Sequence, residues 1–351
     1  MNDHMDLALV AGVDTHRDSH AAALCDGLGR VLAERQAPAT PDGYAGLLAW
    51  ALDAAAGRPL TWALEGSRSY GLGLARHLAG HGQQVTEIDR TTRAGHRRAG
   101  KSDPIDAIRA ARELLARPHP AQPRADGDRE ALRLLMIDRA HAVQSAKTAR
   151  AALAAIVVTA PAPLREQLRH LPPARRTRAC AALTCPPDAD RQTRVLHQTL
   201  NRLGQRIACL AGTAAELETQ ITGIVEDMTP GLVAAEPGLG ALTAAQILLS
   251  WSHPGRIRSE AAFAMLSGTA PLPVSSGRTD RHRLNRLGDR QLNRALHTIA
   301  ITRTRSHPAT LAYIARRRAE GKTDKEIRRC LKRYLARHIY RTLNNHTPPT
   351  T

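Results

Sequence analysis

Aromatic residues are scarce in this chain: they make up 3% of its 351 residues, with a single Phe. Proteins that bind single-stranded nucleic acid by stacking bases need several exposed aromatic rings in one sheet or groove. The composition therefore disfavours a stacking platform of the RRM or OB type. A hydrophobic core is available, because 42% of the residues are hydrophobic, and this excludes a wholly disordered chain.

Cysteine is also rare. The five cysteines are scattered, odd in number and form no CxxC pair, which disfavours a disulfide framework and a zinc ribbon and indicates a reducing cytoplasm. No stretch approaches the roughly 18 consecutive apolar residues of a membrane span. No basic segment precedes a long apolar run at the N-terminus, so we expect no secretory signal and no membrane partner.

Acidic residues are few beside basic ones: 32 Asp+Glu stand against 50 Lys+Arg, a formal net charge of +18. The excess is concentrated in residues 278–305 and 313–341, where Arg and Lys far outnumber acids. Such a concentration is what binding to a phosphate backbone requires. The alternative, a solvated basic tail, stays open at this point.

The first of three expected domains, residues 1–123, alternates strand-like and helix-like segments. Short apolar runs bounded by turn residues predict strands, and longer amphipathic runs predict helices. The expected strands are residues 7–14, 19–26, 30–36, 60–65 and 84–88, and the expected helices are residues 41–56, 70–79 and 103–116. The order βββαβαβα predicts an α/β domain of the RNase H-like type, with helices on the faces of a mixed sheet.

The second domain, residues 124–228, is expected to be a helical, coiled-coil connector. A helix over 128–158 is followed by a linker punctuated by prolines. Apolar residues then alternate at spacings of four and three: Leu196, Leu200, Leu203, Ile207, Leu210, Ala214, Leu217, Ile221, Ile224 and Met228. This heptad seam pairs either with the first long helix or with its copy in another subunit.

The third domain, residues 229–351, is expected to be mainly α-helical. Glu236–Gly240 form a tight turn ahead of an apolar helix over residues 241–249, which resembles a helix-hairpin-helix motif. Gly238 and Gly240 would let the backbone approach a phosphate, and the helix N-terminus favours an anion. An ordinary helix–helix corner would use the same residues.

Four carboxylates of the first domain have a reason to meet. Asp14 and Glu65 end strands that are neighbours in an RNase H-like sheet, and Asp103 and Asp106 lie three apart at a helix start, on one face. Phosphodiester chemistry on two metal ions needs several carboxylates around a site about 4 Å across, and Mg²⁺ prefers oxygen ligands. The alternative gives each acid a local role in a turn or at a helix start. We expect His16 to support the site rather than to bind metal.

A second candidate is the segment APLPVSSGR, residues 270–278, where Ser275 and Ser276 lie in an expected Pro/Gly-bounded loop before an arginine-rich stretch. A serine that attacks a phosphodiester needs positive surroundings. On the residues alone, a Ser-Gly turn beside a phosphate-binding patch is the favoured interpretation. The candidate nucleic-acid-binding residues of this domain are Gly238, Gly240, Arg278, Arg281, Arg283, Arg286 and Arg290.

Together these motifs resemble a known family. GVDTHRDSH, ALEGSRSYG and KSDPIDA are similar to segments of the DEDD transposases of bacterial insertion sequences of the IS110 type, relatives of the Piv-type invertases. EPGLGALTAAQIL and the segment from FAMLSGTAPLPVSSGR to LNRALH resemble that family's C-terminal transposase domain. The two blocks, residues 7–116 and 230–305, occur in the family's order.

The resemblance implies a RuvC-like first domain in which Asp14, Glu65, Asp103 and Asp106 hold Mg²⁺ or Mn²⁺. It also implies a nucleophilic serine directly before the glycine, which is Ser276. The implied function is cutting and rejoining of donor and target DNA, guided by an RNA from the element's noncoding end. The implied assembly is a homo-oligomer, a dimer or tetramer, in the bacterial cytoplasm and associated with the nucleoid.

Two other hypotheses remain at this point. One is a RuvC-like structure-specific endonuclease, in which water attacks the phosphodiester and the serine is idle. The other is a non-catalytic nucleic-acid-binding protein with a degenerate site, against which the complete set of four acids argues. A covalent protein–DNA adduct would distinguish the transposase from the first of these.

Overall fold

The computed structural model describes residues 8–88, 103–117, 122–276, 279–283, 285 and 288–345. The chain divides into two compact units, Met1–Arg124 and Ala125–Thr351. The first unit contains all the carboxylates proposed for catalysis, and the second contains the long helices, the serine segment and the basic C-terminal segments.

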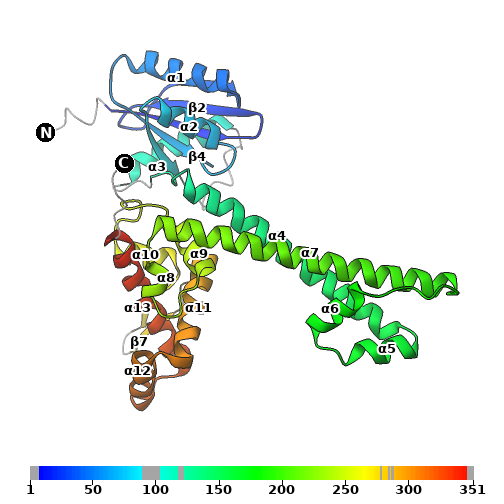
Figure 1. Ribbon diagram of the computed structural model, residues 1–351. Helices are drawn as coiled ribbons and strands as arrows, with labels where there is room; N and C mark the ends of the chain where they lie inside the picture. The colour runs from blue at the N-terminus through cyan, green and yellow to red at the C-terminus, as the bar shows by residue number, and fades with distance from the viewer. Residues whose placement is uncertain are drawn as a thin grey trace. The chain divides into compact units, whose positions relative to one another are not determined.

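A five-stranded sheet of order β3-β2-β1-β4-β5 forms the centre of the first unit (Figure 1). The first three strands are an antiparallel meander, and β1, β4 and β5 run parallel to one another. The strands are β1 (Leu9–Thr15), β2 (Ser19–Cys25), β3 (Val31–Pro38), β4 (Leu60–Glu65) and β5 (Gln84–Ile88). This is the mixed sheet that the sequence pattern predicts, and it is consistent with an RNase H-like domain.

Helices cover both faces of this sheet. Side chains alternate along a strand, so that Val13 packs with Leu47 and Leu74 on one face, whereas Val10 packs with Ala110 on the other. The first face is covered by α1 (Pro41–Ala55) and α2 (Leu72–Gly80), and the second by α3 (Asp103–Ala116). All of β1 is buried, which explains why its sequence is almost entirely apolar until Asp14.

Two long helices, α4 (Asp128–Thr159) and α7 (Arg191–Met228), lie side by side in the second unit (Figure 1). They are antiparallel, because Leu132 shares a core with Val225 at one end and Leu153 shares another with Leu200. The heptad seam of α7 is therefore covered by the first long helix of the same chain. This decides between the two partners that the sequence left open.

The proline-rich segment between these helices is not the linker expected from the sequence. It forms two short helices, α5 (Ala162–Arg169) and α6 (Pro173–Ala181), each with proline in its first turn. Proline is tolerated there because the first N–H groups of a helix have no partner within the helix. An added Cβ at Gly204 of α7 would lie 2.4 Å from the backbone N of Ala181, so this glycine lets α6 approach closely.

The remainder of the second unit is mainly helical around one core, where Trp251 and Phe263 pack with Leu296 and Ile339. Its helices are α8 (Leu232–Ala235), α9 (Ala241–Trp251), α10 (Glu260–Leu266), α11 (Arg290–Ser306), α12 (Pro308–Ala319) and α13 (Asp324–Asn345). None of the helices in the described ranges is long and apolar enough to span a bilayer.

The serine segment forms a hairpin rather than a loop, which corrects the expectation from its prolines. The strands are β6 (Leu272–Ser276) and β7 (Thr279–Arg283), paired antiparallel. Proline lacks an N–H and is excluded from central strands, but both strands of a two-stranded hairpin are edges. Pro273 can therefore occupy β6.

Candidate functional site

The first unit's candidate site forms where α3 crosses β1. An added Cβ at Gly12 would lie 2.0 Å from the backbone O of Ala107 and 2.5 Å from the backbone N of Ala111. Only glycine permits so close a crossing. Asp14 lies two residues beyond Gly12 on the same face of the strand, and Asp103 lies one helical turn before Ala107. The crossing therefore brings these two carboxylates together.

Replacing Gly12 with Ala should test this geometry. The added methyl group meets backbone atoms of α3 and cannot be accommodated by a side-chain rotation. We expect the free energy of unfolding to fall by about 3 kcal/mol or more, measured by urea denaturation. Gly80→Ala in α2 is the matched control, because nothing lies within 4 Å of its added Cβ; an equal loss in both variants would contradict the close crossing.

Asp14, His16 and Asp103 form a cluster in which one ligand atom of each residue lies within 4.8 Å of the others. Nδ1 of His16 lies 3.7 Å from Oδ2 of Asp14 and 3.8 Å from Oδ2 of Asp103. The Asp14 side chain is 11% exposed and that of Asp103 is 42% exposed. The cluster thus runs from the buried end of β1 to solvent, with the imidazole bridging the carboxylates.

Glu65 lies at the adjacent strand end. In the parallel pair β1–β4, Gly12 is opposite Ala63 and Val13 is opposite Leu64, so the register continued by one residue places Glu65 beside Asp14. The Thr15 hydroxyl donates to the backbone O of Glu65 over 2.7 Å and joins the two strand ends. Because Ala63 packs under α3, Glu65 two residues later belongs to the same face as Asp14.

Asp106 is held differently. Nη1 of Arg109 lies 2.5 Å from its Oδ1, in an ion pair three residues apart on α3. Asp106 is not part of the three-residue cluster. The structure therefore joins Asp14 to Asp103, sets Glu65 at the neighbouring strand end, and neutralises Asp106 with an arginine.

This donor set fits a divalent cation. Two carboxylates repel each other at short range unless positive charge lies between them, and a metal ion would supply that charge. Carboxylate oxygens suit Mg²⁺ and Mn²⁺, and imidazole suits several softer divalent ions. The chemistry of the residues present thus permits a metal centre, with Asp14 and Asp103 offering oxygen ligands within 4.8 Å of each other.

Two other polar groups of the first unit lie on the opposite face of the sheet. His20 is fully buried and stacks on Tyr44 of α1, with ring centroids 5.6 Å apart; burial lowers the pKa of its imidazole, so it stays neutral. Glu87, which the sequence did not single out, is buried on β5 and paired with Arg68. Of the two histidines in GVDTHRDSH, only His16 therefore belongs to the carboxylate cluster.

The backbone register of the hairpin places the two serines at different positions. Ser276 pairs with Thr279 next to the turn, and Ser275 pairs with Asp280. The candidate Arg281 and Arg283 lie on β7, opposite Val274 and Leu272. Arg278 and Arg286 lie outside the described residues, and Arg290 is exposed as the first residue of α11.

The turn before α9 contains a glycine with a packing role. Gly238 has φ +80°, and its added Cβ would lie 3.3 Å from the backbone O of Ile299 in α11. The buried Glu236 accepts from Arg303 of α11 over 2.8 Å and pairs with His338 of α13. These contacts explain Gly238 as part of an ordinary corner between helices. Nothing lies within 4 Å of an added Cβ at Gly240, the residue before α9, so the N-terminus of α9 is accessible there.

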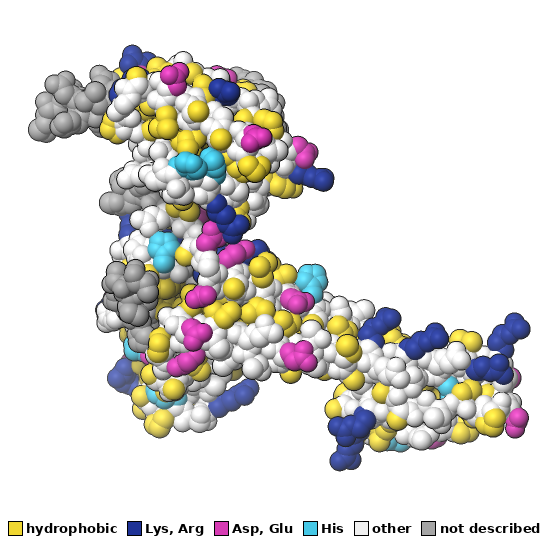
Figure 2. Space-filling view, turned by 45° about the horizontal axis from the view of Figure 1, so that its top comes forward, with side chains coloured by type: hydrophobic (Ala, Val, Ile, Leu, Met, Phe, Trp, Pro, Cys, Tyr) yellow, Lys and Arg dark blue, Asp and Glu magenta, His cyan; other side chains and the backbone are white. Residues whose placement is uncertain are grey.

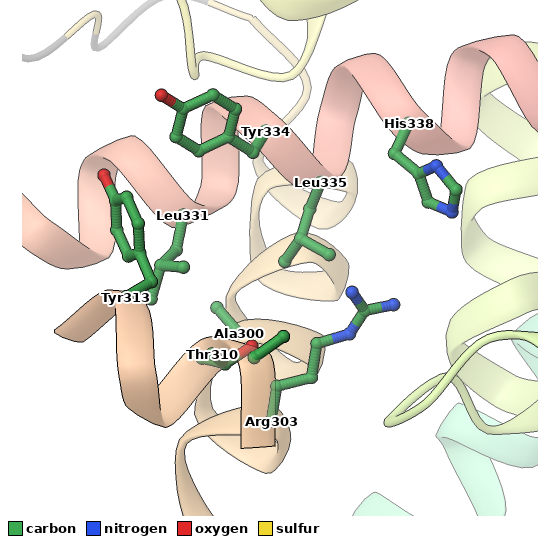
Figure 3. A pocket seen from close by; sticks show the side chains of 9 residues that line it. Ala300, Arg303, Thr310, Tyr313, Leu331, Tyr334, Leu335 and His338 are labelled. Carbon is green, nitrogen blue, oxygen red and sulfur yellow. The ribbon is translucent and has the colours of Figure 1, made fainter. Parts of the chain in front are cut away.

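A hollow of about 190 Å³ lies between α11, α12 and α13 (Figure 3). At one end Tyr313 and Tyr334 meet edge to face with ring centroids 5.8 Å apart, and burial, followed by the nearby Cys330, raises the pKa of Tyr313 to about 12. At the other end lie Arg303 and His338, both of which pair with Glu236. The positive charge of Arg303 at this hollow is therefore balanced by a carboxylate of the same chain.

The far end of the α4–α7 pair carries exposed arginines that sequence reasoning did not single out (Figure 2). Among the described residues, only one of them is paired with a carboxylate, Arg169 with Glu166 over 2.8 Å. The set is Arg169, Arg175, Arg178, Arg191, Arg194, Arg202 and Arg206. They are spread over three helices, α5, α6 and α7.

The fold and the carboxylate cluster of the first unit are consistent with the class of RNase H-like DEDD proteins. Comparisons with known proteins narrow this class. A family model of DEDD transposases of the IS110 group, described as "Transposase", matches residues 11–160, and the model "Transposase IS116/IS110/IS902 family" matches residues 231–315. The chain belongs to the IS110-type transposases, which confirms the resemblance seen in its motifs.

Two similar proteins come from insertion elements. The "Insertion element IS900 uncharacterized 42 kDa protein" of Mycobacterium paratuberculosis is 26% identical over 393 residues, covering 97% of this chain and 98% of that protein. The "Insertion element IS110 uncharacterized 43.6 kDa protein" of Streptomyces coelicolor is 37% identical over 111 residues, but the match spans only 30% of this chain and 27% of that protein.

Proposed function

We propose that this chain is the transposase of an insertion element and that it cuts and rejoins DNA with a carboxylate-bound metal and Ser276. The observation that carries the proposal is the meeting of Asp14 and Asp103, far apart in sequence, at the β1–α3 crossing. Two adjacent carboxylates repel each other unless positive charge lies between them, which is the arrangement that a bound cation would stabilise. The family of the chain supports the same function.

Asp14 and Asp103 would hold Mg²⁺ or Mn²⁺, with Glu65 completing the set from the neighbouring strand end. Asp106 would join when Arg109 releases it, for example to a DNA phosphate. When bound, the metal would polarise a phosphate and help the attacking hydroxyl to ionise. His16, between the two carboxylates, would orient them.

Ser276 would act as the nucleophile at the turn end of β6. Its Oγ forms a bond to phosphorus and loses its proton, while the bond from phosphorus to the leaving sugar oxygen breaks and that oxygen gains a proton. The number of phosphoester bonds is unchanged, so reversal with another DNA end rejoins the strand without ATP. The acids and the serine that act on one phosphodiester come from one copy of the chain or from two, in a dimer or tetramer.

We further propose that an RNA from the element's noncoding end selects the donor and target DNA by base pairing. The strongly basic C-terminal segments and the exposed arginines of the α4–α7 end offer surface for a second nucleic acid. Among the described helices, the sequence also identifies no recognition helix for the DNA major groove. The choice of DNA sequence would then come from base pairing with the RNA rather than from side chains.

The test uses the full chain with labelled duplex DNA containing the element's ends, with Mg²⁺ or a chelator, and with or without RNA transcribed from the noncoding end. Denaturing electrophoresis separates cut DNA from DNA attached to protein. We expect a metal- and RNA-dependent covalent adduct. Cleavage without an adduct would instead favour the water-using endonuclease, and activity in the presence of the chelator would contradict the metal site.

A further inference from the structure

A cavity of about 510 Å³ lies in the second unit beside the base of the β6–β7 hairpin. It is bounded by the first turns of α11, by α13, and by the segments that flank the hairpin in sequence. The residues that matter for its chemistry are Arg290, Asn293, Arg294, His297 and Lys332. Three of these carry positive charge, and they belong to two helices that the fold packs together.

Lys332 is the half-buried centre of this cavity. Its Nζ donates to Oδ1 of Asn293 over 2.7 Å, and Nδ2 of Asn293 donates to the backbone O of Ser267 over 2.6 Å. The ammonium is thus held in place by a neutral group. Burial lowers the pKa of Lys332, and burial together with Lys332 and Arg328 lowers the pKa of His297.

The carboxylate that also lines the cavity is already engaged. Oδ1 of Asp289 accepts from the backbone N of Gln291 and of Leu292 at the start of α11, and Oδ2 accepts from the Ser250 hydroxyl over 2.6 Å. Within the described part of the chain, no ion pair neutralises Arg290, Arg294 or Lys332. The hollow in Figure 3 differs in this respect, because its Arg303 is paired with the carboxylate of Glu236.

We infer that this cavity is a phosphodiester-binding site for the DNA strand that passes the β6–β7 hairpin. Arg and Lys side chains that converge without acidic partners attract an anion, and charge-assisted hydrogen bonds to phosphate are the strongest that they make. Five-residue strands are about 17 Å long, which is close to five nucleotide steps of about 3.4 Å each. A strand cut at Ser276 would therefore reach the cavity a few phosphates away.

This inference rests on the proposed function in one respect: the DNA strand in the cavity is taken to be the one that Ser276 attacks. Its test measures DNA binding alone and does not require DNA cleavage. Binding of the full chain to a fluorescent DNA duplex is measured by anisotropy over a salt series with a chelator present. Lys332→Met and Arg294→Ala should each weaken binding about tenfold and reduce the slope of log affinity against log salt by about 0.9.

Lys325→Met, exposed at the start of α13, and Arg305→Ala, exposed further along α11, remove the same charges outside the cavity. Thermal unfolding checks that Lys332→Met is folded. Arg290→Ala removes a third cavity charge from an exposed position, where the substitution does not disturb the core, and it should change the salt slope in the same way. Slopes in the cavity variants equal to those in the controls would overturn the inference. Loss of binding to an RNA duplex with DNA binding intact would also overturn it, in favour of an RNA site.

The adduct assay on the wild type separates this inference from the proposed function. If the salt slopes change as expected in the cavity variants but the wild type forms no adduct with Mg²⁺, the phosphate site stands and the nucleophile fails. If the adduct forms and the slopes do not change, the nucleophile stands and the phosphate site fails.

Discussion

Replacement of Asp14 with Asn is expected to abolish metal-dependent DNA cleavage while leaving the chain folded. The substitution keeps the size of the side chain and removes one of the two carboxylates that meet at the β1–α3 crossing. Metal-assisted phosphodiester cleavage depends on several kcal/mol of charge stabilisation, so we expect a fall in cleavage rate of about a thousandfold or more. The measurement is single-turnover cleavage of labelled DNA.

The control for Asp14→Asn is Asp18→Asn, because Asp18 lies in the adjacent β1–β2 connection with its side chain 89% exposed. A second readout does not depend on cleavage. Mg²⁺ or Mn²⁺ should raise the melting temperature of the wild type, since a ligand that binds only the folded state stabilises it, and this shift should disappear in Asp14→Asn. Full activity in both Asp14→Asn and Asp103→Asn would remove the carboxylate site from the mechanism.

Replacement of Ser276 with Ala is expected to eliminate both strand exchange and the covalent protein–DNA band. A recombinase must hold the cut end covalently, because water would otherwise release it, and alanine has no atom that can form the phosphoester bond. We expect the adduct to fall below detection on denaturing gels with Mg²⁺, whereas DNA binding in chelator stays at the wild-type level.

Ser275→Ala is the matched control, one position away on β6 and paired with Asp280 rather than with Thr279. It should retain most of the adduct. An adduct lost only in Ser275→Ala would keep the covalent mechanism and correct the residue. Cleavage that persists in Ser276→Ala, with no adduct in the wild type, would favour attack by water.

The first unit could be predicted closely from the sequence, because its signals are local. Each strand of the sheet appears as an apolar run between turn residues, and the structure moves their ends by only a residue or two. The family was also visible, because motifs such as GVDTHRDSH and KSDPIDA are short and contiguous. The hydrophobic pattern that predicts each strand or helix lies within that strand or helix itself, so it can be recognised without knowledge of tertiary contacts.

Other features depended on contacts between segments that are distant in the sequence. A heptad seam defines an apolar stripe but not its partner, and the partner proved to be α4 of the same chain. Proline favours loops in a local pattern, yet Pro173 begins a helix and Pro273 lies in an edge strand. In both cases the deciding factor is which backbone N–H groups the fold leaves without a partner.

The sequence by itself determined the order of strands and helices in the first unit, the family and the set of acids from which a metal site could be built. Only the tertiary structure decided that Asp14 and Asp103 meet around His16 and that Arg109 forms an ion pair with Asp106. It also decided that Lys332 and Arg294 line one cavity, where no described carboxylate forms an ion pair with either. The physical reason is distance. Local propensities act within a few residues, whereas a site needs side chains from separate elements within a few ångströms, and here the absent side chain of Gly12 allows that approach.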